Sequence, residues 1–431
     1  MSDTNTIDEV FRTEWSRLVA ILVRDFGDLE LAEDCAQEAF VQAGKTWGNS
    51  VAFPDRPGAW LTTTARRKAL DVIRRSASYE DKLAQLEVRA RRGPDRPATS
   101  GLVDEQLALV LGCCHPALNL EAQVALTLRL VAGLSTEQIA RGFLVGDDAM
   151  SKRITRAKRK IRAAGVPFDP VDASVLRDRL AAVLHVVYLI FTEGHSGRGD
   201  EALVRGNLCD EAIWLSELLT QLVPEDSEVH GLHALILLTD ARRSTRIGVD
   251  GLPALLEDQD RTQWDQRKIK DGLNALGRAM ERGPLGAVGL QALLASLHTT
   301  APTFDATDWQ RMVRTYDLLR HVDASPVIEL NRAIAVSYAQ GVEAGLAELE
   351  PLQGVLQGYL YLHSTTAEFL RRLGDRDGAA RSYRHALDCE PSTAEYDFLH
   401  SRLATLECVP VDDRGSGGPR QTRSSEAGDG V

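Results

Sequence analysis

Almost every hydrophobic pattern along the chain has the helical period of about 3.6 residues, and strand-like alternation is nearly absent. Ala, Leu, Arg and Glu are abundant, and all four are good helix formers. We therefore expect an all-α protein, which breaker-rich and charged stretches divide into successive parts. These parts are a helical unit over 8–76, a polar connector over 77–101, a second compact helical unit over 102–165, a large all-helical region over 171–408 and a disordered tail over 410–431.

The most informative pattern lies in residues 134–162. A short amphipathic helix is followed by a turn containing Gly146 and then by a second helix, which either Asp147 or Asp148 can cap. Between residues 152 and 162 the second helix carries seven Lys or Arg and no acid. Two such helices, the second basic on its exposed side, are typical of a helix-turn-helix that enters the DNA major groove. The predicted apolar stripe of the second helix is Met150, Ile154, Ala157 and Ile161.

The exposed side of this second helix supplies the candidate DNA contacts. The residues that share one face, and that we expect to read base edges, are Lys152, Thr155 and Arg156. The residues that we expect to contact the phosphate backbone are Ser151, Arg153 and Arg159. The alternative is a charged helix that only faces water, although such helices normally mix positive and negative residues.

The first helical unit contains two further segments with a chemical pattern. Residues 28–47 predict an acidic amphipathic helix that suits a basic protein partner, or else simply faces solvent. In the helix predicted over 59–75, an aromatic and two guanidinium groups recur every seven residues and fall on roughly one face. An aromatic ring that stacks on bases, next to cations that hold phosphates, is what single-stranded DNA binding needs. The residues are Trp60, Arg67 and Arg74, of which Trp60 can equally belong to the core.

Together these segments resemble the sigma-70 superfamily of transcription initiation factors, specifically its extracytoplasmic-function (ECF) branch. AEDCAQEAF looks like the family's polymerase-binding helix, WLTTTARRKALDVIRR like its promoter −10 helix, and residues 134–162 like its −35 recognition motif. The resemblance implies that loop 50–58 and the start of the following helix capture a flipped base of the −10 element. It also implies that core RNA polymerase meets the acidic helix at Asp34, Gln37 and Glu38.

Two positions depart from the family pattern. Arg67 stands where the family commonly has Asn, near the expected base pocket, so the −10 preference does not follow from the resemblance. Cys35 replaces a more usual aliphatic residue, a change that we expect packing to tolerate.

The long C-terminal region resembles a subgroup of these factors with a TPR-like extension. The segments that carry this resemblance include LGCCHPALNLEAQVALTLRL, IFTEGHSG, LLEDQDRTQWD and SPVIELNRAIAV. Residues 363–391 fit the 34-residue TPR pattern, in which small and large side chains interlock two antiparallel helices. A looser unit begins near Asn331, and a third is suggested around His233–Leu256. A helical bundle without a binding groove is the alternative.

The charge is unevenly distributed along the chain. Residues 1–170 hold 24 Lys or Arg against 23 Asp or Glu, whereas residues 171–431 hold 26 against 39, within a formal net charge of −12. An acidic extension disfavours direct DNA contact. We therefore hypothesise that the extension contacts the sigma domains or the polymerase and governs activity.

Several other kinds of site are disfavoured. Cys113-Cys114-His115 lacks the CxxC spacing of zinc sites, and we find no catalytic constellation, so we expect neither metal, cofactor nor enzymatic activity. No run of about 18 apolar residues suggests a membrane span. The six scattered cysteines and the absence of a secretory signal favour a cytoplasmic protein with reduced thiols.

The reading that uses all of these patterns is a sigma factor whose partners are core RNA polymerase and promoter DNA. The first rival is a polymerase-independent helix-turn-helix regulator whose C-terminal region senses a ligand. It leaves the acidic helix and the Trp60 helix without a role. A more distant rival is a TPR scaffold whose charged helices never contact DNA.

Overall fold

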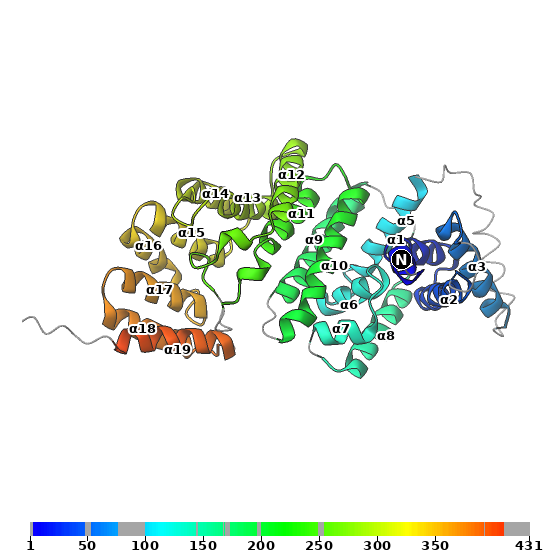
Figure 1. The fold of residues 1–431 in the computed structure, drawn as a ribbon, viewed down its shortest axis with the longest axis horizontal. Helices are drawn as coiled ribbons and strands as arrows, with labels where there is room; N and C mark the ends of the chain where they lie inside the picture. The colour runs from blue at the N-terminus through cyan, green and yellow to red at the C-terminus, as the bar shows by residue number, and fades with distance from the viewer. Residues whose placement is uncertain are drawn as a thin grey trace, which may run out of the picture. The chain divides into compact units, whose positions relative to one another are not determined.

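The structure is a computed structural model that describes residues 3–47, 53–75, 100–143, 145–166, 168, 173–195, 200–248, 254–391 and 393–408. These residues form helices and connecting loops, so the predicted all-α class is confirmed (Figure 1). None of the described helices is both long and apolar enough to cross a membrane. The chain divides into two compact units, Met1–Ala324 and Ser325–Val431.

The first unit holds all of the segments predicted to contact DNA or polymerase. Its helices are α1 (Asp3–Phe26), α2 (Leu29–Trp47), α3 (Pro57–Arg75), α5 (Ser100–Cys113), α6 (Leu120–Leu130), α7 (Thr136–Gly142), α8 (Asp147–Ala163), α9 (Ala173–His195), α10 (Asp200–Leu222), α11 (Ser227–Asp240), α12 (Gln266–Arg282), α13 (Ala287–Thr300) and α14 (Trp309–Val322), with short 3-10 helices η1 (Arg243–Thr245) and η2 (Arg261–Gln263).

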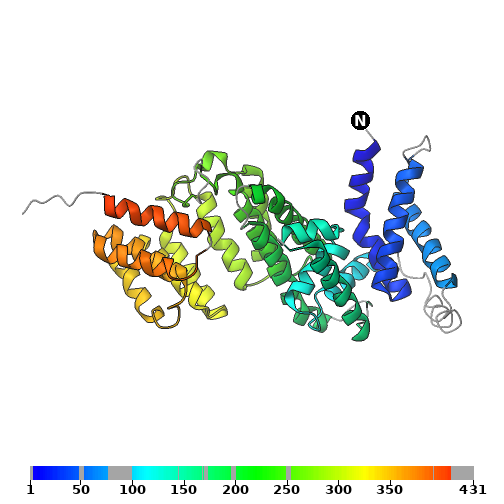
Figure 2. The ribbon, with the colours of Figure 1, turned by 90° about the horizontal axis from the view of Figure 1, so that it is seen from below.

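Helices α1, α2 and α3 pack together along their apolar sides (Figure 2). Aromatic rings join α1 to α2: the Phe11 ring lies 5.0 Å from both Trp15 and Phe40, measured between ring centroids. Small buried residues on α2 and α3 let the helices approach closely. These residues are Ala32, Ala36, Ala39, Ala43, Ala65 and Ala69.

The second predicted helical unit packs directly on the first. Helix α5 lies against α1, and α6 and α7 both contact α8. Two polar groups link α1 to α5 in the interior, where Gln106 Nε2 donates to Ser16 Oγ at 2.8 Å. The domain boundaries predicted from sequence stay a prediction, but these helices share one hydrophobic core.

A buried carboxylate reinforces this packing. Glu33 on α2 is only 3% exposed. Its Oε1 atom accepts from Arg129 Nε on α6 at 2.5 Å, and its Oε2 atom pairs with Lys158 Nζ on α8. A buried charge is costly unless it is paired, so this carboxylate ties three helices together.

Helices α9 and α10 extend the same core (Figure 1). Helix α10 contacts α5 and α7, and α9 contacts α5 and α6. Leu208 of α10 lies so close to Gly142 of α7 that a Cβ atom there would sit 2.9 Å from its Cδ1. At the edge of the core, Arg12 Nη2 lies 3.9 Å from Glu211 Oε1.

Helices α11, α12 and α13 pack side by side. The carboxylate of Glu228 on α11 accepts backbone N–H groups of Gly286, Val288 and Gly289 at 2.9–3.0 Å, which satisfies the start of α13. The α11 and α13 backbones are in close approach at Gly231, where an added Cβ would lie 2.8 Å from Gly289 Cα.

The loosely predicted repeat around His233–Leu256 stays a prediction. In the described residues, α11 ends at Asp240, η1 follows, and the next α-helix begins at Gln266 and contacts α11. At the end of α11, the buried Asp240 carboxylate accepts from Arg243 Nε at 2.7 Å and Lys268 Nζ at 2.6 Å. These pairs join the end of α11 to η1 and α12.

The second unit consists of α15 (Pro326–Ala339), α16 (Val342–Leu349), the short η3 (Glu350–Leu352), α17 (Leu360–Arg372), α18 (Arg376–Leu387) and α19 (Thr393–Cys408). Helices α15 and α16 pack as one pair and α17 and α18 as another, with α19 against α18 (Figure 2). These pairs occupy the two C-terminal segments with repeat-like spacing, and their assignment as TPR repeats stays a prediction. Of the residues with the interlocking spacing, Leu370 and Pro391 are half-buried, and the buried ones are Ala367, Ala379, Tyr383 and Ala386.

We predict that Glu33→Gln lowers the free energy of unfolding by about 3 kcal/mol, because Arg129 and Lys158 are left without a carboxylate in the interior. Urea unfolding followed by circular dichroism measures the effect. Glu30→Gln is the matched control on the same helix, since the Glu30 side chain is 59% exposed and lies 3.7 Å from Arg162. Equal, small effects of both substitutions would contradict the buried cluster.

A second prediction concerns pH. Burial raises the pKa of Glu211 from 4.5 to about 7, with Arg12 opposing and Asp210 assisting the change. Between pH 4.5 and 7 the folded protein therefore binds more protons than the unfolded chain, and stability falls as pH rises through this window. At about 1.4 kcal/mol per pH unit, the loss approaches roughly 3 kcal/mol at pH 8.

Glu211→Gln should abolish this loss, so its thermal midpoint should exceed that of the wild type at pH 8 and match it near pH 4.5. Glu217→Gln, at an exposed position of the same helix, is the control. A wild-type advantage at pH 8 would refute the assignment.

Candidate nucleic-acid interface

Helices α7 and α8 lie where the pattern over 134–162 predicts two helices. Ser135 caps α7, accepting from Gln138 N at 3.1 Å while Gln138 Oε1 accepts from Ser135 N at 2.7 Å. The predicted cap of α8 at Asp147 or Asp148 is wrong, because the N-cap is Gly146 and makes no side-chain bond, while both aspartates lie within the first helical turn. The apolar stripe of α8 is buried as expected, at Met150, Ile154, Ala157 and Ile161.

The face of α8 opposite that stripe is open to solvent. Its cations, with two hydroxyl side chains, form a continuous polar surface, because positions three and four apart lie on one side of a helix. Arg153 lies at the edge of this surface and pairs with Glu121 of α6 at 2.9 Å. The exposed members of the predicted DNA-contact set are Ser151, Lys152, Thr155, Arg156 and Arg159.

The remaining flank of α8 faces α2. Lys158 is tied to Glu33, and Arg162 Nη2 donates to Asp28 Oδ1 at 2.6 Å. The cations of α8 therefore have two different surroundings: some face water, and some hold the helix against the acidic end of α2. The sequence alone did not separate these two groups.

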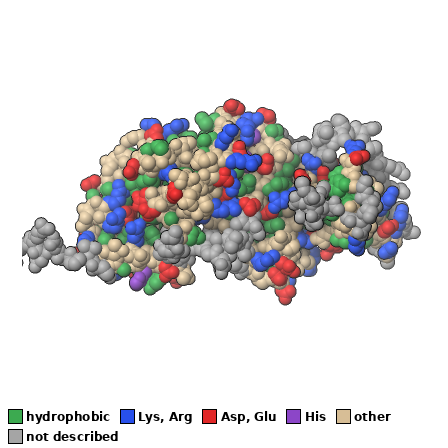
Figure 3. All heavy atoms as spheres, in the orientation of Figure 1, with side chains coloured by type: hydrophobic (Ala, Val, Ile, Leu, Met, Phe, Trp, Pro, Cys, Tyr) green, Lys and Arg blue, Asp and Glu red, His purple; other side chains and the backbone are tan. Residues whose placement is uncertain are grey.

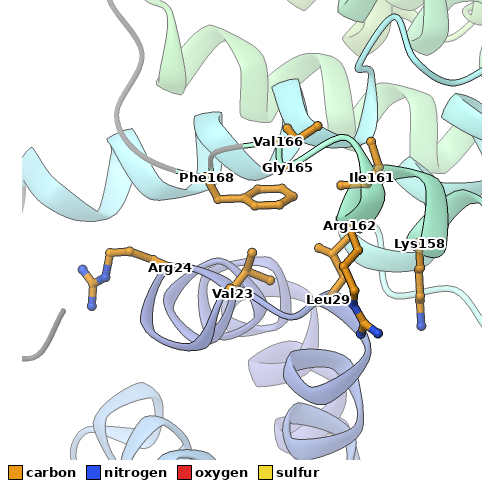
Figure 4. A pocket seen from close by; sticks show the side chains of 10 residues that line it. Val23, Arg24, Leu29, Lys158, Ile161, Arg162, Gly165, Val166 and Phe168 are labelled. Atoms are coloured by element: carbon orange, nitrogen blue, oxygen red, sulfur yellow. The ribbon is translucent and has the colours of Figure 1, made fainter. Parts of the chain in front are cut away.

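A hollow of about 230 Å³ lies between the corner of α1 and α2 and the end of α8 (Figure 4). Val23, Leu29, Ile161 and Val166 line it, and the Phe168 ring points into it from the chain that follows α8. Charged side chains line it as well, so its surface is more polar than apolar. These residues are Arg24, Lys158 and Arg162.

The residues predicted to contact the −10 element lie on α3, and they differ in exposure and in their contacts. Trp60 is half-buried, with its ring centroid 5.3 Å from Trp47, so it belongs to an aromatic cluster with one side partly accessible. Arg67 is exposed. Arg74 is also exposed and lies 3.6 Å from Asp71 one turn earlier. The loop residues 50–52 lie outside the described residues, whereas Phe53 packs on Trp47 at 4.9 Å between ring centroids.

The residues predicted to contact polymerase lie on α2. Asp34 and Glu38 are exposed, and Gln37 is half-buried and donates to Glu33 Oε1 at 3.3 Å. Glu38 Oε2 accepts from Lys68 of α3 at 2.7 Å. Partial desolvation raises the pKa of Asp34, and the neighbouring Glu33 carboxylate adds to this effect. The structure thus groups Asp34 and Glu38 on one acidic surface beside the end of α8.

Sequence reasoning missed Glu33 and Asp28, which both receive cations of α8. For Glu33 a signal existed, because it stands between Ala32 and Ala36 on the packed side of a helix. A carboxylate at such a position needs a cationic partner, although the sequence does not say which one.

One group of side chains has ligand types suited to a metal ion. His195, Cys209 and Asp240 offer ligand atoms within 4.8 Å of one another. They fit a metal poorly, because both Asp240 oxygens already accept from Arg243 and Lys268. Burial raises the pKa of the Cys209 thiol to about 12, which disfavours the thiolate that a metal binds. Burial likewise raises the pKa of Cys113 and Cys114.

The face drawn in Figure 3 carries Lys and Arg side chains interspersed with Asp and Glu. No single sign of charge covers it, in spite of the acidic composition of residues 171–431. Local clusters of charge therefore matter more for recognition than the overall balance.

Comparisons with known proteins assign two segments of the chain. Residues 10–79, which contain α2 and α3, match the family described as Sigma-70 region 2. Residues 179–280 match a family of unknown function, DUF6596.

Two relatives extend this assignment. A probable ECF RNA polymerase sigma factor, SigI, of Mycobacterium tuberculosis is 27% identical over 172 residues, covering 38% of this chain and 58% of that protein. An uncharacterised protein of Rhizobium meliloti (strain 1021) is 39% identical over 416 residues, covering 95% of this chain and 98% of that protein. The chain therefore belongs to the family of the Rhizobium protein, and its N-terminal helices match Sigma-70 region 2.

Proposed function

We propose that this protein is an RNA polymerase sigma factor of the ECF type that directs promoter-specific initiation and catalyses nothing itself. The observation that carries the proposal is the pairing of two features in one unit. One is the Sigma-70 region 2 match over α2 and α3, and the other is the exposed cationic face of α8.

Duplex recognition at the −35 element is assigned to α8, as the second helix of a helix-turn-helix. Its apolar stripe holds it on α6 and α7, so the opposite face is free to enter a major groove. Lys152, Thr155 and Arg156 are the base-reading candidates. Ser151, Arg153 and Arg159 are the candidates for phosphate contact.

Capture of the melted −10 strand is assigned to α3. Its face carries the partly accessible Trp60 ring and the exposed Arg67 and Arg74 guanidinium groups. Single-stranded DNA binding combines two interactions: bases stack on an aromatic ring, and phosphates pair with guanidinium groups. Binding of core polymerase is assigned to the acidic surface of α2 at Asp34, Gln37 and Glu38.

The ion pairs between α2 and α8 bear on how this factor works. A sigma factor whose α2 lies on polymerase while α8 lies on a −35 duplex needs these two helices free of each other. We propose that the arrangement described here is a closed form, and that polymerase binding competes with Lys158 and Arg162 for the acidic end of α2.

The C-terminal region is assigned a modulating role through contact with the sigma helices. The supporting contacts are the packing of α10 on α5 and α7, the bond from Arg179 Nη2 to Leu111 O at 2.8 Å, and the Arg12–Glu211 pair. These contacts support the proposal that α9 and α10 stabilise or oppose the closed form.

In vitro transcription with core polymerase and a promoter library tests the proposal as a whole. We expect the chain to direct defined start sites and to yield the promoter motif. A protein that neither co-purifies with core polymerase nor selects start sites, but binds duplex DNA alone, would favour the polymerase-independent regulator instead.

Asp34→Asn should weaken capture of core polymerase about tenfold, since it removes a charge from the proposed docking surface without disturbing an ion pair in the described residues. Biolayer interferometry with immobilised polymerase measures the affinity. Glu217→Gln, which removes an exposed charge from α10, should leave the affinity unchanged. A loss that is the same for both variants would argue for a nonspecific charge effect.

Arg156→Ala should cost about 1–3 kcal/mol at a cognate promoter and relax discrimination at one base pair, as loss of a base contact does. Lys160→Ala is the matched control, because it removes the same charge from the edge of the same helix. Both variants should lose affinity for random duplex alike. If Arg156→Ala weakens cognate and random DNA by equal factors, Arg156 contacts phosphate rather than bases.

A further inference from the structure

The chain that follows α8 turns back toward the helices that precede it. Gly165 has a φ of 60°, a left-handed conformation that ends a helix and that glycine adopts without strain. The backbone N–H of Gly165 donates to Arg162 O at 3.1 Å, and that of Val166 donates to Ile161 O at 3.4 Å. This pair of bonds is the Schellman motif, which closes α8. The cap leads the chain toward α1 and α5, where Phe168 lies.

The Phe168 ring is seated against a glycine of α5. A Cβ atom at Gly112 would lie only 2.2 Å from Cε1 of the ring and 2.9 Å from its Cδ1. Side chains do not approach each other so closely, so any substitution at Gly112 must displace the ring. In Figure 4 the ring lies between Val166, at the end of α8, and Val23 of α1. One aromatic side chain therefore joins three helices that are far apart in the sequence.

This seat is specific in shape but incompletely filled. Phe168 is only half-buried, and the hollow of about 230 Å³ adjoins its ring. A ring beside empty space has few contact atoms on that side, so withdrawing it costs less dispersion energy than withdrawing a core phenylalanine. Phe191, which is 1% exposed in the same core, is an example of a fully packed ring. The Phe168 ring can therefore leave its seat without unfolding the core.

Both halves of the contact are tied to the C-terminal region. Phe168 stands five residues before Ala173, where α9 begins. Helix α9 also holds the seat, because Arg179 Nη2 donates to Leu111 O at 2.8 Å, and Leu111 adjoins Gly112. A displacement of α9 therefore acts on the ring and on its seat together.

The hollow next to the ring is also where α8 is held against α2. Lys158 and Arg162 line the hollow and pair with Glu33 and Asp28 of that corner. The Lys158 and Glu33 side chains are 15% and 4% exposed, so their pair lies in a nearly dry environment. The attraction between opposite charges weakens when water reaches them, because water has a much higher dielectric constant than the protein interior.

We propose that Phe168, seated against Gly112, is a latch through which the C-terminal region holds the closed form. When α9 shifts, the ring leaves its seat and water enters the hollow. The pair between Lys158 and Glu33 then weakens, and α8 separates more readily from α2. This inference rests on the proposed function, because the closed form matters only if α2 and α8 have separate partners. It adds the residue that couples the extension to the sigma helices.

Distances between spin labels on α2 and α8, measured by double electron–electron resonance on the full chain, test the latch without polymerase or DNA. The labels are placed at the exposed positions Val41→Cys and Thr155→Cys. Cys389 and Cys408 are replaced by Ser in this background, since the other four cysteines are buried. Phe168→Ala should add a component at longer distance, raising the open population about fivefold over the wild type.

Gly112→Ala should give the same change while the ring is intact, because the new Cβ takes the seat of the ring and alanine favours the helix. Gly277→Ala on α12 is the matched control, since nothing lies within 4 Å of the Cβ position there. In the double variant with Phe168→Ala, Gly112→Ala should add nothing, because the ring that it displaces is gone. Additive changes would mean that Gly112→Ala disturbs α5 directly, and would overturn the latch.

The part played by the extension has its own variant. Arg179→Met frees Leu111 from α9 and should lengthen the distance between the labels in the same direction. An unchanged distance would remove the C-terminal region from the proposal. Unchanged distances in both Phe168→Ala and Gly112→Ala would refute the latch altogether.

Affinity for core polymerase separates the latch from the proposed function. Phe168→Ala should bind polymerase about fivefold more tightly than the wild type in biolayer interferometry, because more of the protein is already open. Longer distances without tighter binding would support the latch and count against the proposed function. Tighter binding without any change in distance would contradict the latch.

Discussion

The Glu33 carboxylate, almost fully withdrawn from water, is shared by the guanidinium of Arg129 and the ammonium of Lys158. The arrangement of the first unit depends on it, because it joins α2 to α6 and α8 across about a hundred residues of sequence. A buried ion pair gains little net stability, but its geometry tolerates little change and a lost partner is costly. The pair therefore specifies one relative position of these helices rather than simply strengthening their packing.

This constraint divides the surface of α8 into three parts with separate roles. One stripe is apolar and lies in the core, one flank holds α2 through Lys158 and Arg162, and the opposite face remains exposed. The acidic end of α2 therefore meets a basic partner within the chain itself. Any external basic partner, as polymerase is proposed to be, must compete with that contact, so electrostatic exchange can couple docking to release of α8.

The C-terminal region shows how misleading an average charge can be. Residues 171–431 are strongly acidic in composition, yet Arg242, Arg246 and Arg261 gather in one place within them. Asp240, only two residues before Arg242, is itself bound by Arg243 and Lys268. Residues of one charge can therefore gather within a region whose composition favours the other, and recognition depends on the spatial distribution.

The sequence by itself determined what depends on local spacing. The bounds of α2, α3, α7 and α8, the buried stripe at Met150 and Ile154 and the exposed face at Arg156 all follow from the helical period, because side-chain direction repeats every 3.6 residues. Contacts between distant segments carry no such signal. Only tertiary structure decided that Glu33 receives Lys158, and that Arg242 meets Arg261, since neither sequence separation nor residue type specifies which charges become neighbours when the helices pack.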